Sequence, residues 1–151
     1  MQLKFLIAIF LTLNFSGCSF FNKNNNLLNQ QSNKINREII ANYNKAISKD
    51  PSNFVFYLER GKAKYDSGNF VGAIADYNYA TKLNPNIKVD FYKANAKFSY
   101  GDFRGAIIDY QKLINNENSK DEIFFNLAVS QFITSNYQDA LKNFTMSIEL
   151  D

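Results

Sequence analysis

The chain has 151 residues, which is enough for one domain. It carries 17 basic and 14 acidic side chains, and this mild excess of positive charge does not indicate a nucleic-acid partner. Because the sequence has no histidine and a single cysteine, it lacks the usual general base, a cysteine-based zinc site and the means to form an internal disulfide.

The first 17 residues have the pattern of a secretory signal. Lys4 precedes a short apolar core, Phe5 to Leu13, and small residues lead up to Cys18. The core has about half of the roughly 20 residues that a membrane-spanning helix needs. Ser16-Gly17-Cys18 resembles the bacterial lipoprotein signal, in which the peptide is cleaved before the cysteine. This resemblance implies that residues 1–17 are removed and that Cys18 carries the acyl chains of a membrane anchor.

The resemblance departs from the family pattern at one position. Phe15 stands where that family usually has leucine, so a plain secretory signal and an uncleaved apolar anchor remain alternatives. Ser19 resembles the residue that follows the cysteine in lipoproteins of the outer membrane. We therefore expect a lipid-anchored protein of the cell envelope, on the periplasmic face of the outer membrane if the bacterium has two membranes.

Asparagine, glutamine and serine dominate the residues that follow. Such a stretch buries too little apolar surface to offset its chain entropy, so we predict that residues 18–34 form the lipidated cysteine and a flexible tether. The repeat domain is expected over 35–151, and it begins with a leading helix at 35–51.

The remaining sequence repeats itself in steps of 33 or 34 residues. Three repeats are expected, at 54–86, 87–120 and 121–151. Each has small residues where two helices would approach and aromatic residues where hairpins would stack. The recurring positions are Gly61, Ala94 and Ala128; Phe70, Phe103 and Tyr137; Ala73, Ala106 and Ala140; and Tyr77, Tyr110 and Phe144.

This pattern resembles the tetratricopeptide repeat, a 34-residue unit of two antiparallel helices. The resemblance implies an all-α fold, a short right-handed solenoid of three helical hairpins after the leading helix. It also implies a protein-binding scaffold without a cofactor or bound metal, and not an enzyme. No pair of carboxylates converges on one predicted face and no glycine-rich phosphate loop is present, which disfavours a carboxylate enzyme.

In this family the first helix of each unit lines a concave groove, where a protein or peptide partner would bind. The positions carried over to this chain are Leu58, Lys62 and Tyr65 in the first unit, Phe91, Asn95 and Phe98 in the second, and Phe125, Val129 and Phe132 in the third. Aromatic anchors often dominate binding energy. The alternative is that these aromatic residues pack between neighbouring units.

Four charged residues depart from the repeat pattern together. The first two units have Arg60 and Lys93 where leucine is usual, and they also have Asp76 and Asp109 in the second helix. We predict ion pairs between Arg60 and Asp76 and between Lys93 and Asp109. The alternative is that all four are unrelated surface charges.

The last predicted hairpin has no further repeat to cover it. We expect an exposed apolar edge there, which a partner or a second copy of the chain would cover. Two functions follow: a binding scaffold at the envelope, in an assembly or secretion complex, or a self-associating structural lipoprotein without a separate partner.

Overall fold

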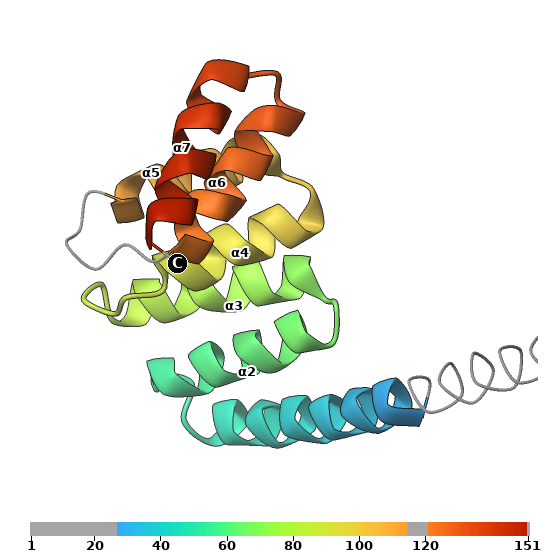
Figure 1. Ribbon diagram of the computed structural model, residues 1–151. Helices are drawn as coiled ribbons and strands as arrows, with labels where there is room; N and C mark the ends of the chain where they lie inside the picture. The colour runs from blue at the N-terminus through green and yellow to red at the C-terminus, as the bar shows by residue number, and fades with distance from the viewer. Residues whose placement is uncertain (1–26, 115–120, 151) are drawn as a thin grey trace, which may run out of the picture.

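The computed structural model describes residues 27–114 and 121–150, which form seven helices and no strand (Figure 1). The predicted all-α class is thereby confirmed. A leading helix spans residues 27–49. It is followed by α2 (Phe54–Asp66), α3 (Phe70–Leu83), α4 (Asp90–Tyr100), α5 (Phe103–Ile114), α6 (Asp121–Ile133) and α7 (Tyr137–Leu150). The predicted signal peptide and Cys18 lie outside the described residues.

The helices form three hairpins that stack in chain order. Helices α2 and α3 pack against each other, as do α4 with α5 and α6 with α7, and each hairpin lies within one predicted repeat. Contacts between α3 and α4 and between α5 and α6 join successive hairpins (Figure 1). The apolar faces of neighbouring hairpins therefore share a continuous interior.

In two of the hairpins, the turn between the helices contains a glycine with a left-handed backbone conformation. Gly68 has φ 81° and Gly101 has φ 90°, a conformation that residues with a Cβ rarely adopt. The next residue, Asn69 or Asp102, accepts a hydrogen bond of 2.9 Å from a backbone N–H three residues later. Because of this cap, the second helix begins directly after the turn. The short connection keeps the two helices of each hairpin side by side.

Close contact inside the hairpins depends on small residues opposite tyrosines. A Cβ added to Gly61 would lie 2.6 Å from the Tyr77 ring, so only glycine fits there without movement. In the second hairpin, Ala94 and Ala106 are fully buried beside Tyr110. The predicted alternation of small and large residues therefore builds the core.

The structure corrects the predicted tether. Residues 27–34 were assigned to a flexible segment, yet they are helical and continuous with the leading helix. Lys34 stands one repeat before Gly68, so this position lacks the left-handed glycine that follows α2 and α4. The helix therefore runs straight through this position, and its beginning extends past α2 (Figure 1).

Candidate functional site

Side chains of α2 and α4 contact each other at the centre of the candidate groove. Ala96 of α4 is buried in the cluster that contains Tyr77. Across this contact, the Tyr65 hydroxyl lies 3.1 Å from the Ser99 hydroxyl. The Lys62 ammonium lies 5.2 Å from the centre of the Tyr92 ring, in cation–π distance.

A cavity of about 310 Å³ opens between these helices. It is lined by Lys62, Tyr65, Asp66, Tyr77, Phe91, Tyr92 and Asn95. Four of them, Lys62, Tyr65, Phe91 and Asn95, were predicted as groove residues. Aromatic walls with a few fixed polar groups are typical of sites that bind a side chain of a peptide or a small ligand.

Hydrogen bonds hold the polar groups of the cavity in place. Lys62 donates to Glu59 at 2.8 Å, and this hydrogen bond raises the pKa of Lys62, which burial alone would lower. Asn95 accepts a hydrogen bond of 2.5 Å from the Tyr110 hydroxyl. Burial raises the pKa of Tyr77 and of Tyr110, so both phenols stay neutral at physiological pH. The lysine therefore presents a fixed positive charge beside neutral aromatic rings.

The rest of the predicted aromatic stripe does not join this cavity. Leu58 packs against the buried cluster that contains Tyr77, and Phe98 packs against the cluster that contains Tyr110. Packing between units, the alternative interpretation, therefore accounts for these two residues.

The three predicted groove residues of the last unit also lie apart from the cavity. Phe125 and Phe132 are exposed and Val129 is half-buried. Phe125 contacts the ring of Phe144 in its own hairpin, and Phe132 contacts Tyr137. These rings remain accessible, but at the end of the stack.

One predicted ion pair forms and the other does not. Arg60 contacts Asp76 through two nitrogens, at 2.6 and 2.8 Å, and this hydrogen bonding raises the pKa of Arg60. The pairing of Lys93 with Asp109 was wrong. Asp109 instead accepts from Lys97 at 2.6 Å and from Lys112 at 3.2 Å. Lys97 lies one helical turn beyond Lys93, at the place where α4 faces the carboxylate.

A polar pair in one register links the two helices of every hairpin. Its members are separated by 12 residues in each case: Lys64 with Asp76 at 2.8 Å, Lys97 with Asp109 at 2.6 Å, and Gln131 with Asn143 at 2.7 Å. The sequence interpretation missed this contact. The simultaneous change from charged to neutral at both positions of the third unit was the signal that could have found it.

The described residues contain no group of three or more acidic, histidine or cysteine side chains that could hold a metal ion. Of the helices in the described part of the chain, none has the length and apolar character required to cross a membrane.

Comparison with known proteins supports the fold. No family model matches the sequence, and no curated protein matches it. Among solved structures, the chain is similar to MamA MSR-1 C2, a tetratricopeptide-type protein, with a TM-score of 0.66 and 20% sequence identity. The match covers 74% of this chain and 65% of that one. The chain has a tetratricopeptide-like helical repeat fold.

Proposed function

We propose that this chain is a lipid-anchored scaffold of the bacterial envelope that binds a peptide segment of another protein, as part of an assembly or secretion complex. The observation that carries the proposal is the cavity between α2 and α4, where four predicted groove residues converge. Its aromatic walls suit an apolar anchor side chain of the partner, and Lys62 suits a neighbouring carboxylate or carbonyl.

The binding part of the proposal is tested by crosslinking in the native membrane. Full-length protein would be compared with a groove variant, Lys62→Glu combined with Asn95→Lys, and with Lys142→Glu, an exposed change on α7. We expect a distinct protein to be captured by the wild type and by Lys142→Glu, and its recovery to fall at least tenfold with the groove variant. Equal recovery from all three would exclude this cavity as the binding site.

The anchor is tested separately, because it depends on a residue outside the described structure. Cys18→Ser removes the only thiol to which the lipid could be attached. We expect the wild type to incorporate labelled palmitate and to partition into the detergent phase, and the variant to do neither. If the variant still partitions with detergent and the wild type takes up no label, the signal is an uncleaved apolar anchor.

The second candidate function, a self-associating structural lipoprotein, has one observation in its favour. Leu141 and Ile148 on α7 are 66% and 78% exposed, so the last hairpin presents an apolar surface. Recovery of this chain alone in the crosslinking experiment would favour self-association over the scaffold.

A further inference from the structure

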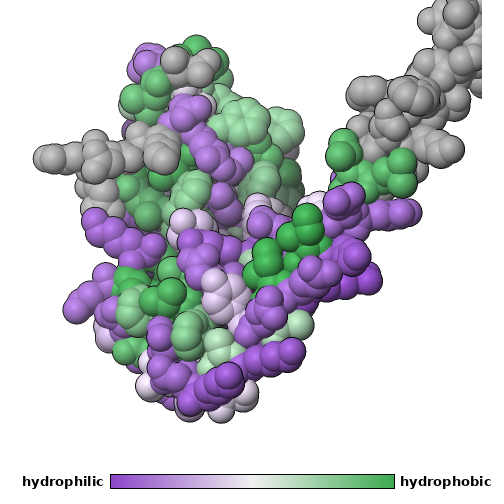
Figure 2. Space-filling model, turned by 90° about the horizontal axis from the view of Figure 1, so that it is seen from below, coloured by the Kyte–Doolittle hydropathy of each residue, from purple (hydrophilic) through white to green (hydrophobic). Residues whose placement is uncertain are grey.

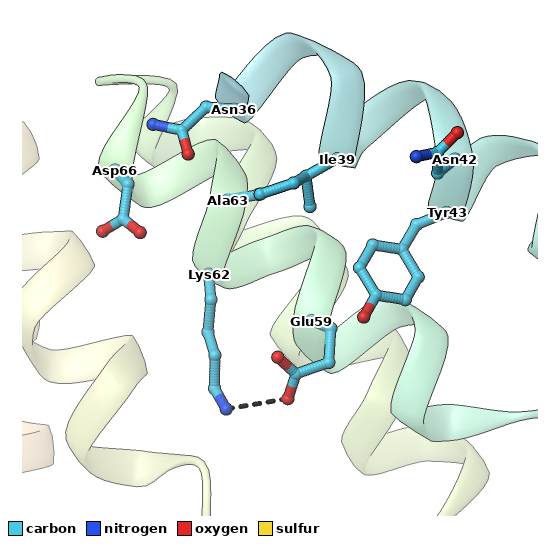
Figure 3. Close-up of a pocket in the computed structure, with 8 residues that line it drawn as sticks. All are labelled: Asn36, Ile39, Asn42, Tyr43, Glu59, Lys62, Ala63 and Asp66. Atoms are coloured by element: carbon cyan, nitrogen blue, oxygen red, sulfur yellow. Dashed lines mark hydrogen bonds and ion pairs between the residues drawn. The ribbon is translucent and has the colours of Figure 1, made fainter. Parts of the chain in front are cut away.

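A second, larger cavity lies between the leading helix and α2; it shares Lys62 and Asp66 with the first cavity, and its other lining residues have no part in the proposed function. Its volume is about 470 Å³. It is lined by Asn36, Ile39, Asn42, Tyr43, Glu59, Lys62, Ala63 and Asp66. Figure 3 shows the two helices on either side of this space, with Lys62 directed toward Glu59.

The wall formed by the leading helix corresponds to the face of α3 that packs against α2. Asn42 and Tyr43 stand 34 residues before Asp76 and Tyr77. In α3 these two residues contact the first helix of the same hairpin, because Asp76 binds Lys64 and Tyr77 closes over Gly61. The leading helix therefore presents the face of a second helix that has no first helix against it within the described residues.

The opposite wall corresponds to the face of α4 that packs against α3 and contacts α2 through side chains. Ala63 and Asp66 stand 33 residues before Ala96 and Ser99. Ala96 is buried in the cluster around Tyr77, and Ser99 contacts Tyr65 of the preceding first helix. Both walls are thus built to receive a first helix, in the position that α2 occupies between α3 and α4. We call this cavity the open helix site.

The chain contains a segment whose register fits the open helix site. Gln30 precedes Asn42 by the same 12 residues that separate Gln131 from Asn143. Within one copy the pair cannot form, because both residues lie on one continuous helix. At a rise of 1.5 Å per residue they are about 18 Å apart along its axis.

The segment 27–34 also leaves apolar surface uncovered. Leu27 is 55% exposed and Leu28 is 68% exposed. Figure 2 shows hydrophobic patches along the leading helix in a surface that is otherwise largely hydrophilic there. Leu27 stands where the other first helices have glycine or alanine, and Ile39 stands where α3 has Ala73. A contact between two helices that carry Leu27 and Ile39 at these positions would be apolar. The axes of the two helices would lie farther apart than those of the two helices in a hairpin.

We propose that the open helix site receives residues 27–34 of a second copy of this chain. The two leading helices would lie antiparallel about a two-fold axis near Asn36, so that Gln30 of each copy reaches Asn42 of the other. This isologous arrangement fills both sites at once and closes the assembly as a dimer. It places Gln31 beside Asp66, as Tyr65 lies beside Ser99, with the basic Lys34 one turn further along.

The test uses full-length chains in detergent, with Cys18→Ser as the background. One chain carries Gln31→Cys and the other Asp66→Cys, and the two are mixed and treated with a short bismaleimide. Because each chain has one thiol, only contact between copies can join them. We expect a crosslinked dimer in the mixture at least tenfold above either chain alone. The matched control, Tyr65→Cys with Ser99→Cys in one chain, should crosslink within the monomer.

Two results would overturn the proposal. One is an intramolecular crosslink in a chain carrying both Gln31→Cys and Asp66→Cys with no dimer in the mixture, since the segment would then fold back on its own copy. The other is no crosslink at all while the control reacts. A third measurement distinguishes dimerisation from loss of folding. By sedimentation we expect Leu28→Glu to convert the dimer to monomer with unchanged helix content, because the Leu28 side chain is 68% exposed in one copy.

Discussion

At the scale of single residues, the buried carboxylate of Asp109 forms ion pairs with two lysines in the second hairpin. It is 3% exposed and is held by Lys97 at 2.6 Å. Asp109→Ala would leave the half-buried Lys97 ammonium without this partner, so we expect the free energy of unfolding to fall by about 2 kcal/mol. Urea unfolding followed by circular dichroism measures the change. Lys93→Ala, the control, should alter it by less than about 0.5 kcal/mol.

The third hairpin supplies a neutral replacement for this pair. Lys97→Gln with Asp109→Asn introduces the Gln131–Asn143 contact into the second hairpin. Because both buried partners change together and only the exposed Lys112 ammonium loses its contact with the carboxylate, we expect a loss below about 1 kcal/mol. A loss as large as that of Asp109→Ala would show that the neutral pair does not form in this hairpin.

The same pair predicts a dependence of stability on pH. Burial would raise the pKa of Asp109, but hydrogen bonds from Lys97 and Lys112 and their charges outweigh it and hold the pKa below its usual value. A lowered pKa stabilises the fold above the unfolded value of about 3.9, and the contribution is lost as pH falls through the folded pKa. We therefore expect the free energy of unfolding to fall more steeply below about pH 4 in the wild type than in the Lys97→Gln, Asp109→Asn variant. Parallel curves would contradict this account.

The error over Lys93 shows what spacing alone leaves undetermined. Lys93 and Lys97 are four residues apart on α4, so both share one side of the helix. Which of them meets the carboxylate depends on where the two helices cross, and the repeat pattern does not specify that point. For Arg60 the prediction held because its long side chain reaches Asp76 from one turn away, alongside Lys64.

At the scale of elements, the turns inside the hairpins determine where helices end. The backbone N–H of Asn69 bonds to the Lys64 carbonyl, and Asn136 bonds to Gln131 in the same way, both at 2.8 Å. Yet the third turn places Ser135 at φ 66°, where the first two have glycine. A left-handed residue with a Cβ costs about 1–2 kcal/mol. Ser135→Gly should therefore raise the free energy of unfolding by about 1 kcal/mol, measured by urea titration.

A matched substitution in the first turn checks that explanation. A Cβ added to Gly68 would meet nothing within 4 Å, so Gly68→Ala changes backbone preference without a clash. We expect it to lower the free energy of unfolding by about 1 kcal/mol. If Ser135→Gly were neutral while Gly68→Ala destabilised, contacts of the serine side chain would have to offset its backbone strain.

The turns also explain which elements the sequence could predict. The six helices of the three repeats follow from periodic small and aromatic residues punctuated by Gly68, Gly101 and Asn136. The extent of the leading helix did not follow, because its polar composition is typical of a flexible tether. The leading helix lacks the glycine that follows α2 and α4, and asparagine and glutamine are tolerated on its exposed surface.

At the scale of the whole molecule, the stack covers its hairpins unequally. Ile107 is half-buried against the cluster that contains Tyr110, whereas Leu141, one repeat later, is exposed on the last hairpin. The same position of the repeat is thus part of the interior in the second hairpin and part of the surface in the last one. Leu141→Glu should change the free energy of unfolding by less than about 0.5 kcal/mol, and Ile107→Glu should lower it by about 2 kcal/mol or more.

The variants Leu141→Glu and Leu28→Glu separate the two surfaces through which copies could associate. The apolar surface of α7 lies at the opposite end of the stack from the leading helix (Figure 1). If α7 also binds a second copy, sedimentation of the wild type should show species larger than a dimer that increase with concentration. Leu141→Glu should then remove those species and leave the dimer, while Leu28→Glu should leave contacts through α7 alone. If the wild type forms nothing larger than a dimer and Leu141→Glu does not change its sedimentation, the α7 surface faces a different protein or solvent. The reason is that association of copies through an apolar surface should increase with protein concentration and should be weakened by a charge placed on that surface.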